Sequence, residues 1–472
     1  MKTIYPYFLA GEFKTSNDKL QVIDKYENIA FAETYLADES TLDLAIKKGL
    51  EAREVMKNLT SLQKYEILHE IHLKINAKRQ ELAELLSRES AKPIRYATTE
   101  IDRAAQTFLI AAEECKRLPR EYMSLDWTEN GRNKEGIVQH FPIGLVAGIS
   151  PFNFPLNLAV HKIAPAIAAG CPIILKPSST TPLSTLALAE IIAETTLPKG
   201  AISILPMNRK TGNLLVTDER IKLLSFTGSP EIGWQMKKNC GKKKVVLELG
   251  GNAGVIIAES ANFEDALRKS MIGAFAYSGQ ICIHAQRFFV HEKHFENFKN
   301  KMVELTKQLK FGNPLKPETE ISDMIDEENA IRVTTWIEDA RNLGAKLLCG
   351  GTRTGKFVEP TILTNCTNKM KVYSEEVFGP VVCIESYTGT IENAISFVND
   401  SKFGLQCGVF TNEVSELDKC FKKLDVGGVI HNDVPTLRFD QMPYGGVKES
   451  GIGREGVKYA ILDMLEPKIL VK

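Results

Sequence analysis

Residues 143–177, IGLVAGISPFNFPLNLAVHKIAPAIAAGCPIILKP, contain the pattern that decides the fold. A short apolar run, Ile143–Ile149, is followed by a helical segment, Leu156–Ala169, and then by a second apolar run, Pro172–Lys176. Short apolar runs separated by helical segments are typical of parallel strands joined by crossover helices. We therefore expect a doubly wound α/β sheet around this stretch.

The alternation continues to Leu249 and then begins again. After Gly251 a second series of strands and helices starts with Gly254–Ala258 and runs to about Gly428. A chain of 472 residues is too long for one ordinary core, so two α/β domains are expected. In the first series, further strands are predicted at Ala201–Leu205, Ile221–Phe226 and Lys244–Leu249, with helices at Pro182–Thr196, Arg209–Thr217 and Glu231–Lys238.

The segments before and after these two series have simpler patterns. From Ser40 to Ala91 apolar residues recur at helical spacing, and Pro93 ends the pattern. A second helix is expected from Thr99 to about Lys116. Tyr122–His140, with an Asn-Gly turn, indicates an exposed hairpin, and Lys468–Val471 indicates a last strand.

The composition is that of a globular protein, with 43% apolar and 25% charged residues. Lys plus Arg and Asp plus Glu both number 59, so no net field attracts nucleic acid or a membrane surface, and neither is an expected partner. The nine Cys include no CxxC pair, which argues against a disulfide framework and a zinc site, so no metal is expected. Without a long apolar segment, the protein is expected to be soluble and cytoplasmic.

Three motifs contain the residue types that carry out covalent chemistry on a carbonyl group. Cys282 lies in YSGQICI, Glu248 in LELGG and Asn153 in SPFNFP. A thiol can act as a nucleophile, a carboxylate as a base and a side-chain amide as an oxyanion donor. A lone Cys is usually an inert buried side chain, but the three motifs together favour catalysis. To attack, Cys282 needs either a lowered thiol pKa or a base that takes its proton.

The chain resembles the aldehyde dehydrogenase superfamily over essentially its whole length. It has Pro-Phe-Asn-Phe-Pro around Asn153 where other branches have Pro-Trp-Asn, and is similar to the branch of lactaldehyde, phosphonoacetaldehyde and semialdehyde dehydrogenases. The other shared motifs are Ile174–Ser178, Phe226–Ser229, Glu375–Pro380 and Pro443–Gly451.

This resemblance implies a division of the chain into three parts. Residues 1–120 and 141–250 would form a Rossmann-like dinucleotide-binding domain, and residues 251–430 a catalytic domain. Residues 121–140 and 457–472 would form a small β appendage, joining hairpin and tail across subunits of a homodimer or homotetramer. From the residues alone, a local hairpin is an equally good prediction.

The resemblance also implies a reaction, the NAD(P)-dependent oxidation of an aldehyde to a carboxylate. Cys282 would attack the aldehyde to give a thiohemiacetal, whose oxyanion the Asn153 amide and the Cys282 backbone N–H would bind. After hydride passes to nicotinamide, Glu248 would activate the water that hydrolyses the thioester.

Two alternatives stay open on the sequence. Some relatives pass the thioester to coenzyme A, which would make the protein a coenzyme A-acylating semialdehyde dehydrogenase. Those relatives tend to lack the glutamate, so Glu248 favours water. The second alternative is a non-catalytic binding or structural protein with this fold. Such a protein would not need Cys282, Glu248 and Asn153.

The cofactor site departs from the usual glycine-rich fingerprint, because GSPEIG follows the strand at Phe226. Ser229 can cap the next helix and Pro230 suits its first turn, so the helix N-terminus would face the pyrophosphate of NAD or NADP. Lys176 resembles the lysine that binds the adenosine ribose, and Glu376 the carboxylate that binds the nicotinamide ribose. The other expected cofactor contacts are Ser150, Pro151, Phe152, Ser178, Ser179, Gly228, Gly233, Leu249 and Phe378.

Ser179 leaves the choice between NAD and NADP open. Relatives that prefer NAD often carry a glutamate at this position, three residues after the lysine, where it binds both ribose hydroxyls. Ser179 removes the repulsion against a 2′-phosphate, but the sequence identifies no arginine to bind that phosphate.

Three polar residues suggest a small polar or anionic aldehyde as substrate. His161 falls where many relatives have a large aromatic residue, Arg438 lies in a loop that is apolar in relatives, and Arg103 is a third candidate. Alternatively, Arg438 pairs with Asp440 or Asp433, and His161 is structural. Lactaldehyde, phosphonoacetaldehyde, glyceraldehyde 3-phosphate and succinate semialdehyde all fit. The other expected substrate contacts are Phe154, Ile281, Ile283 and Tyr444.

Overall fold

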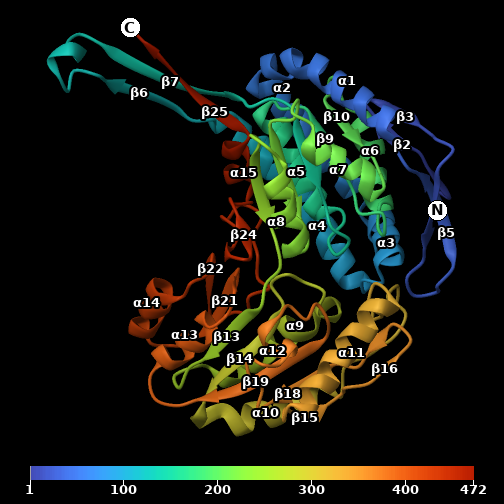
Figure 1. Cartoon of the computed structure of the whole chain (residues 1–472), viewed down its shortest axis with the longest axis vertical. Coiled ribbons are helices and arrows are strands. Elements are labelled where there is room, and N and C mark those ends of the chain that lie inside the picture. The colour runs from blue at the N-terminus through green and yellow to red at the C-terminus, as the bar shows by residue number, and fades with distance from the viewer. Residues whose placement is uncertain (1) are drawn as a thin grey trace.

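Two largely parallel sheets, one in each of two lobes, organise the chain, and a narrow arm projects from the upper lobe (Figure 1). The computed structural model describes residues 2–472. The predicted α/β class with two doubly wound units and a small β appendage is confirmed by these sheets. None of the helices described in this range has the length and apolar character that crossing a bilayer needs.

The sheet of the first lobe has eight strands in the order β24-β12-β11-β8-β9-β10-β2-β3. Its five central strands are parallel, with β8 in the middle, and antiparallel strands close both edges. The strands are β2 Tyr7–Leu9, β3 Glu12–Lys14, β8 Val146–Ile149, β9 Ile173–Lys176, β10 Ile202–Ile204, β11 Leu223–Thr227, β12 Lys244–Glu248 and β24 Gly451–Ile452. The crossover helices are α5 Asn157–Ala169, α6 Leu183–Ala193, α7 Arg209–Thr217 and α8 Pro230–Asn239.

The strand order of this sheet determines where a ligand can bind. From β8 the chain builds outward through β9 and β10, then crosses back to place β11 on the other side of β8. The order therefore reverses between β8 and β11, and crevices at such switch points lie outside the carboxyl ends of the strands. The loops that leave β8 and β11 begin at Ser150 and Gly228, in two of the motifs singled out from the sequence.

The N-terminal region differs in detail from its prediction. The helical segment predicted from Ser40 to Ala91 is three helices, divided by a capping box between Thr60 and Gln63 and by a turn at Lys78. The next helix begins at Ile94, not at Thr99, because a proline at a helix start loses no hydrogen bond. The elements are β1 Ile4–Tyr5, β4 Lys19–Ile23, β5 Ala30–Tyr35, α1 Glu39–Asn58, α2 Ser61–Ala77, α3 Arg79–Ser90, α4 Ile94–Glu114 and the 3₁₀ turn η1 Cys115–Arg117.

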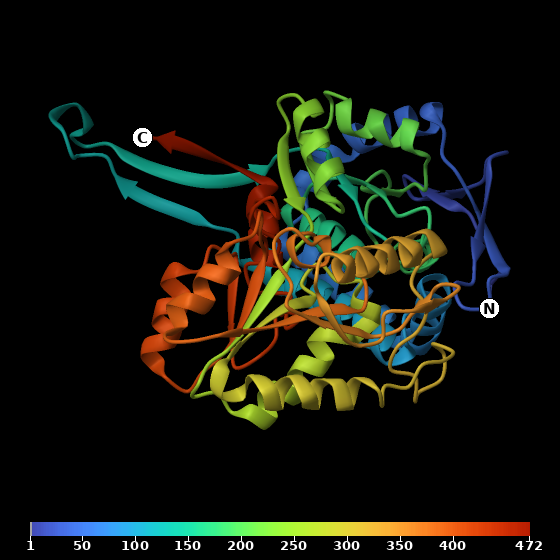
Figure 2. The same ribbon diagram turned by 60° about the horizontal axis from the view of Figure 1, so that its bottom comes forward.

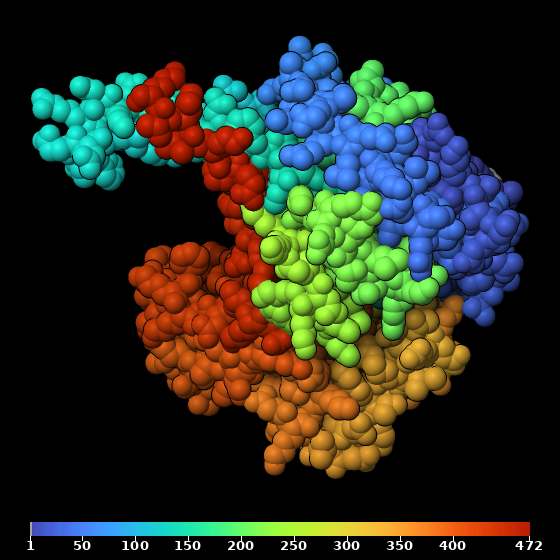
Figure 3. Space-filling view, turned by 45° about the horizontal axis from the view of Figure 1, so that its top comes forward, coloured from blue at the N-terminus to red at the C-terminus, as the bar shows by residue number. Residues whose placement is uncertain are grey.

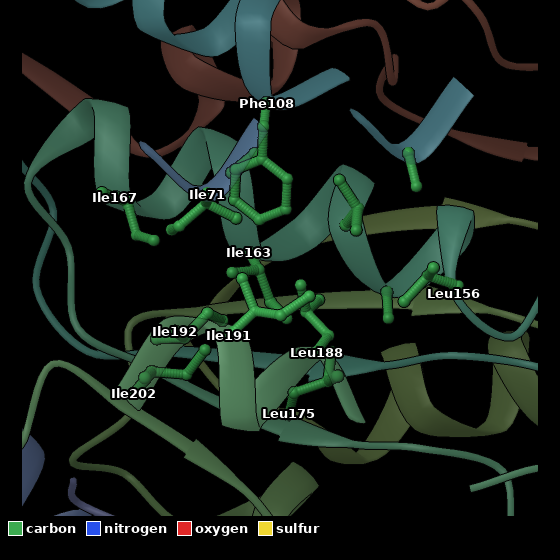
Figure 4. Packing of buried hydrophobic residues seen from close by; sticks show 14 of the residues in the cluster. Ile71, Phe108, Leu156, Ile163, Ile167, Leu175, Leu188, Ile191, Ile192 and Ile202 are labelled. Atoms are coloured by element: carbon green, nitrogen blue, oxygen red, sulfur yellow. The ribbon is translucent and has the colours of Figure 1, made fainter. Parts of the chain in front are cut away.

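The core of the first lobe lies where these helices meet the sheet. In Figure 4, Phe108 of α4 and Ile71 of α2 point toward Ile163 of α5, below which lie Leu175 of β9 and Leu188 of α6. All five side chains are fully buried. This packing fixes α5, and with it the loop that carries Asn153.

The second lobe has a seven-stranded sheet in the order β15-β18-β19-β14-β13-β21-β22, in which β15 alone is antiparallel. Figure 2 shows this lobe with α10 and α11 along its near side. The strands of this lobe, inside and outside that sheet, are β13 Ala253–Ile257, β14 Ala285–His291, β15 Lys346–Cys349, β16 Arg353–Thr354, β17 Phe357–Val358, β18 Thr361–Thr364, β19 Val381–Tyr387, β20 Phe403–Gly404, β21 Gln406–Phe410, β22 Gly428–His431 and β23 Val447–Lys448. Its helices are α9 Phe263–Phe275, η3 Ala276–Gly279, α10 Glu292–Thr306, α11 Glu327–Asn342, α12 Lys371–Ser374, α13 Ile391–Asn399 and α14 Val414–Lys423.

After β22 the chain returns to the first lobe, where β24 pairs with β12. Helix α15, Val457–Asp463, then packs on α5, with Val457 and Ile461 in the core of the first lobe. Of the tail 457–472 assigned to the appendage, therefore, only β25, Leu465–Val471, lies in the arm.

The arm is a three-stranded antiparallel sheet in the order β25-β7-β6, with the short turn η2, Glu129–Gly131, at its tip. Strands β6, Arg120–Ser124, and β7, Glu135–Pro142, form the predicted hairpin, and β25 pairs with β7 within the same chain. Hairpin and tail thus form one sheet within the chain. Figure 3 shows the arm standing clear of the body.

Candidate active site

A cavity of about 310 Å³ lies at the switch point of the first sheet, between the two lobes. Asn153 lines it from the loop after β8, and Glu248 from the end of β12. Cys282 lines it from the second lobe. The structure thus brings together three residues that are 95 and 34 positions apart in the chain, the three that the sequence selects as catalytic.

The loop that carries Cys282 has an unusual backbone. Tyr277, Ser278 and Gly279 all have positive φ, of 48°, 52° and 68°. A side chain at Gly279 would collide with the carbonyl oxygen of Gly379. The Tyr277 hydroxyl donates to the carbonyl oxygen of Ser90 at 3.1 Å. Left-handed conformations at non-glycine residues cost energy and persist only where surrounding contacts hold them, so this loop is fixed in place.

The Cys282 thiol is held in a weakly ionising state. Its Sγ lies 3.0 Å from the Tyr444 hydroxyl. Burial raises the thiol pKa to about 12, with the carboxyl groups of Glu376 and Glu248 adding to the rise and Arg438 opposing it. The sequence left two options for Cys282, a lowered thiol pKa or a base that takes its proton. The first is not found in this structure. A base has to take the proton.

Glu248 lines the same cavity and is a candidate for this base, and its carboxyl group lacks partners. Both carboxyl oxygens are buried without a hydrogen bond to any described residue. Burial, and then the charge of Glu455, raise the pKa of Glu248 well above its usual value, while Arg438 and Lys162 oppose the rise. A carboxyl group with a raised pKa is a stronger base once ionised, so it can exchange a proton with a thiol or with water.

Glu455 connects this carboxyl group to two buried cations. The Lys162 ammonium donates to Glu455 Oε1 at 3.0 Å and to the Thr227 hydroxyl at 2.7 Å. The Arg438 guanidinium donates to Glu455 Oε2 at 3.0 Å. These cations hold the pKa of the Glu455 carboxyl far below its usual range. Glu455 is thus ionised, and Glu248 is the acid of this pair that carries the proton.

Hydrogen bonds of the side-chain amide and of the backbone carbonyl position Asn153. Its side-chain Nδ2 donates to the carbonyl oxygen of Gln280 at 2.9 Å, which leaves a second amide hydrogen for a ligand. The backbone carbonyl oxygen of Asn153 accepts from the buried Lys92 ammonium at 2.6 Å. Lys92 is paired with Glu100. The Glu100 carboxylate also accepts from the backbone N–H groups of Leu156 and Asn157, where α5 begins.

The polar groups of a second cavity, of about 660 Å³, fit the adenosine half of a dinucleotide. The cavity is lined by Lys176 and Ser179 after β9, and by Phe226 at the end of β11. Helix α8 starts at Pro230 with Ser229 in the N-cap position, but the Ser229 side chain makes no cap hydrogen bond, contrary to the expected capping. The backbone N–H groups of the first turn therefore have no side-chain acceptor and can meet a pyrophosphate.

The smaller cavity fits the nicotinamide half. Glu376 Oε1 accepts from the Gly251 backbone N–H at 3.0 Å, and burial raises the Glu376 pKa to about 7. The Phe378 ring meets the Phe152 ring edge-on, with centroids 5.8 Å apart. A side chain at Gly250 would collide with the Glu376 carboxyl group, which explains the glycines at the junction of the lobes.

The remaining expected cofactor residues lie around these two cavities. Pro151, Gly228 and Leu249 line the smaller one. The Ser150 hydroxyl is buried without a partner among the described residues, as a ligand-binding group would be. The Ser178 hydroxyl instead accepts from the Thr180 backbone N–H at 3.2 Å, and Gly233 is buried in α8.

Several residues of the two cavities were missed from the sequence, among them four on helices α11 and α7. Asn329 and Arg332, on α11, line the smaller cavity, and Arg209 and Lys210, on α7, line the larger one. Nothing in the local pattern of α11 indicates this position. The start of α7, however, follows β10 in the same parallel series, so its place at the carboxyl edge of the sheet was predictable. The larger cavity therefore has an arginine, which the sequence analysis did not identify.

The expected substrate residues fall into an apolar and a charged group. The apolar group, Phe154, Ile281, Ile283 and Tyr444, forms one cluster with Cys282. In the charged group, Arg438 stacks on the Tyr444 ring, with the guanidinium carbon 3.6 Å from the ring centroid.

Asp440 organises the rest of the charged group. It accepts from Arg103 at 2.6 Å and from His161 Nε2 at 2.8 Å. The sequence suggested that Arg438 could pair with Asp440 or Asp433. It pairs with Glu455 instead, because a β-bridge between Tyr444 and Glu455 brings Glu455 beside Arg438. Burial, and then the charge of Arg438, lower the pKa of His161, so its imidazole is neutral near pH 7.

This charged group has an excess of positive charge. Three cations, Arg103, Arg438 and Lys162, face two ionised carboxylates, Asp440 and Glu455. The Nε of Arg438 is buried without an acceptor among the described residues. The cluster thus has one uncompensated positive charge and a free donor one side chain away from Cys282. No group of three His, Cys, Asp or Glu within residues 2–472 is arranged to hold a metal ion.

Comparisons with known proteins agree with this geometry. A model of the aldehyde dehydrogenase family matches residues 13–470. The 3-sulfolactaldehyde dehydrogenase of Priestia aryabhattai is 40% identical over 99% of this chain and 98% of its own.

Two solved structures extend these comparisons. Aldehyde dehydrogenase 21 from Physcomitrella patens, in complex with the reaction product succinate, is 42% identical over 100% of this chain and 98% of its own, with a TM-score of 0.98. The NADP complex of glyceraldehyde-3-phosphate dehydrogenase from Methanocaldococcus jannaschii is 36% identical over 97% of this chain and 100% of its own, with a TM-score of 0.92. The chain therefore belongs to the aldehyde dehydrogenase family, as an NAD(P)-dependent enzyme.

Proposed function

We propose that this enzyme oxidises a small anionic aldehyde to the corresponding carboxylate, with NADP as its preferred cofactor. The observation that carries the substrate class is the uncompensated positive charge beside Cys282, with the unpaired Nε of Arg438. A buried guanidinium with a free donor is suited to bind a carboxylate, sulfonate or phosphate. One similar protein is named for 3-sulfolactaldehyde, and another was solved in complex with its reaction product succinate.

The first half of the reaction forms a covalent adduct on Cys282. Glu248, once ionised, takes the thiol proton, and the sulfur attacks the carbonyl carbon to give a thiohemiacetal. The free hydrogen of the Asn153 amide and the Cys282 backbone N–H bind the oxyanion, and losing one such donor typically costs about 10²–10³ in rate. Bound NAD(P) supplies the hydride acceptor, beside Glu376 and Phe378.

The second half releases the product. Once Glu248 has released the thiol proton to solvent, it takes a proton from water, whose oxygen attacks the thioester carbon. The C–S bond breaks, the sulfur keeps the electron pair as the Cys282 thiolate, and the carboxylate leaves. The buried carboxyl group of Glu248, without partners of its own, supports water rather than coenzyme A as the acceptor.

The NADP preference rests on the larger cavity. Ser179 lines it where a carboxylate would repel a 2′-phosphate, and Arg209 lines it without an ion pair to any described residue. Lys210 pairs with Glu39 at 2.8 Å. In the Arg209→Ala variant, kcat/KM for NADP should fall at least tenfold while kcat/KM for NAD hardly changes, because a charge-assisted hydrogen bond contributes about 1.5–3 kcal/mol. An equal effect on both cofactors would contradict this assignment, and Lys238→Ala, in the last turn of α8, is the matched control.

We also propose a cytoplasmic homo-oligomer. All nine cysteines are free thiols, which suits a reducing compartment. The arm leaves two unpaired strand edges, on β6 and β25, that a second copy of the chain could extend.

A panel of aldehydes tests the substrate class. Anionic succinate semialdehyde and 3-sulfolactaldehyde are compared with neutral lactaldehyde and butyraldehyde, each with NADP and NAD, with and without coenzyme A. We expect the highest kcat/KM with an anionic aldehyde, free carboxylate as product, and no effect of coenzyme A. A neutral aldehyde with the highest kcat/KM would overturn the substrate class. A requirement for coenzyme A would instead support the acylating alternative.

A further inference from the structure

The Tyr444 hydroxyl is the polar side-chain group in contact with the Cys282 sulfur, and no step described so far uses it. The two atoms lie 3.0 Å apart, within hydrogen-bond distance for sulfur. Tyr444 is 2% exposed, and its hydroxyl has no other hydrogen-bond partner among the described residues. An aromatic ring that only lined the substrate path would not need a hydroxyl at this place.

The fold fixes this hydroxyl from two sides. The backbone of Tyr444 forms an antiparallel β-bridge with Glu455, and the Tyr444 N–H donates to the Glu455 carbonyl at 2.9 Å. The Arg438 guanidinium covers the ring at 3.6 Å, and the Glu455 carboxylate holds Arg438 at 3.0 Å. The same acidic residue thus anchors both the backbone of Tyr444 and the cation that stacks on its ring.

We propose that Tyr444 is a catalytic residue whose hydroxyl donates a hydrogen bond to the Cys282 thiolate. This inference rests on the proposed covalent mechanism and adds to it a group that stabilises the charged sulfur. A thiolate can only accept, so once Cys282 loses its proton the phenol is the donor of the pair. Burial raises the pKa of Tyr444 well above its usual value, so the phenol keeps its proton throughout the working range.

The same hydrogen bond acts in both halves of the reaction. Before attack, it stabilises the thiolate that forms when Glu248 takes the thiol proton. During hydrolysis the C–S bond breaks and the electron pair returns to sulfur, so the hydrogen bond stabilises the leaving group. Within the covalent adduct the sulfur is neutral and gains little from the bond, so the contact favours the states in which sulfur carries charge.

Several charged groups act on the same thiol, and the test has to separate them. Glu248 and Glu376 disfavour the thiolate of Cys282, and Arg438 favours it. Tyr444→Phe leaves all three in place and keeps the ring on which Arg438 stacks. It removes only the hydroxyl.

The experiment follows alkylation of Cys282 by iodoacetamide as a function of pH, read by peptide mass spectrometry in the absence of aldehyde. In Tyr444→Phe the midpoint should move up by about one pH unit, with about a tenfold slower reaction at fixed pH below it, since hydrogen bonds to charged groups are of this strength. An unchanged pH profile in the folded variant would overturn the proposal. Tyr459→Phe, on α15, is the matched control and should not change the profile.

A second replacement tests the sign of the effect. Replacing Tyr444 with 3-fluorotyrosine, whose hydroxyl is a stronger donor, should move the midpoint down, and an unchanged or raised midpoint would again overturn the proposal. Because alkylation needs no aldehyde or cofactor, the result is independent of the substrate class. An aldehyde panel that contradicts the proposed function therefore leaves this test intact, and the reverse also holds.

Discussion

At the scale of single residues, the site depends on acidic groups that are buried without the partners that would keep them ionised. Cys282 and Glu248 both have raised pKa values, chiefly because they are buried. Glu248 must lose its own proton before it can accept the one on Cys282, and that transfer moves a single negative charge from the carboxylate to the sulfur. The arrangement keeps the nucleophile protonated and unreactive until the site is ready to use it.

The raised pKa of Glu248 leads to a pH prediction. A base works only when deprotonated, so with the raised pKa of Glu248 turnover limited by thioester hydrolysis should still rise with pH above about pH 5.5. A carboxylate with the ordinary pKa of about 4.3 would give a plateau from about pH 5.5. The measurement is kcat against pH at saturating aldehyde and cofactor. A flat profile over this range would show that the carboxyl group is already ionised in the working enzyme.

Arg438 gives the second prediction at this scale. Arg438→Leu should lower kcat/KM for an anionic aldehyde about ten- to hundredfold relative to a neutral aldehyde of similar size, because it removes a charge-assisted hydrogen bond. The neutral aldehyde is the internal control for any general disturbance of the cluster. If the ratio of the two kcat/KM values does not move, Arg438 acts only as the ion-pair partner of Glu455.

At the scale of elements, the turn between α3 and α4 supports the oxyanion donor. Ala91 has a left-handed backbone, with φ of 55°, and Lys92 follows it. The Lys92 ammonium binds the Asn153 carbonyl oxygen and lies over the rings of Phe154 and Tyr277, at 3.7 and 4.4 Å from their centroids. One buried lysine therefore contacts both the loop of the amide and the loop of the nucleophile.

Replacing this lysine should separate chemistry from binding. Lys92→Met keeps the apolar stem but loses the ammonium group, so kcat should fall at least tenfold while the KM for NADP changes little. Because Glu100 would be left as a buried unpaired charge, stability should fall as well, by about 3–5 kcal/mol. The double variant Lys92→Met/Glu100→Gln removes that charge. It should regain stability but not kcat, and recovery of both would show that Lys92 is only structural. Lys116→Met, over the Tyr65 ring, is the matched control.

The elements also show what the sequence could and could not predict. The predicted strands Ile143–Ile149 and Lys244–Leu249 were enough to place Asn153 and Glu248 at the carboxyl edge of one sheet, because that edge is where parallel strands end. It could not pair Arg438 with Glu455, since that contact depends on a β-bridge between two irregular segments. The contact between Lys92 and Asn153 has the same origin, because it joins residues 61 positions apart with no shared pattern.

At the scale of the whole molecule, the arm is the part that is suited to contact a second copy of the chain. It projects from the body with exposed apolar residues on β6 and β25, among them Tyr122, Ile469 and Leu470. A long apolar strand edge without a partner favours association with another chain. The tail already pairs with its own hairpin, so a second copy would add to the outer edges instead of exchanging the tail.

Truncation tests this role. A chain ending at Leu465 should form a smaller assembly than the full chain, measured by size-exclusion chromatography with light scattering. Leu470→Lys should weaken assembly in the same direction, while Leu62→Lys, at an exposed position on α2, should not. A full chain that is monomeric at micromolar concentration, or a truncated chain of unchanged assembly size, would contradict the proposed role of the arm.

Trapping the thioester shows whether it forms on Cys282 and whether Glu248 is needed for its hydrolysis. The Glu248→Gln variant is mixed with succinate semialdehyde and NADP, quenched, and analysed by peptide mass spectrometry while NADPH is counted. We expect about one NADPH per active site and a succinyl group on the peptide of Cys282, with no further turnover, and neither signal in Cys282→Ala. Continued turnover without an acyl peptide, or an acyl group on another residue, would contradict a thioester mechanism on Cys282.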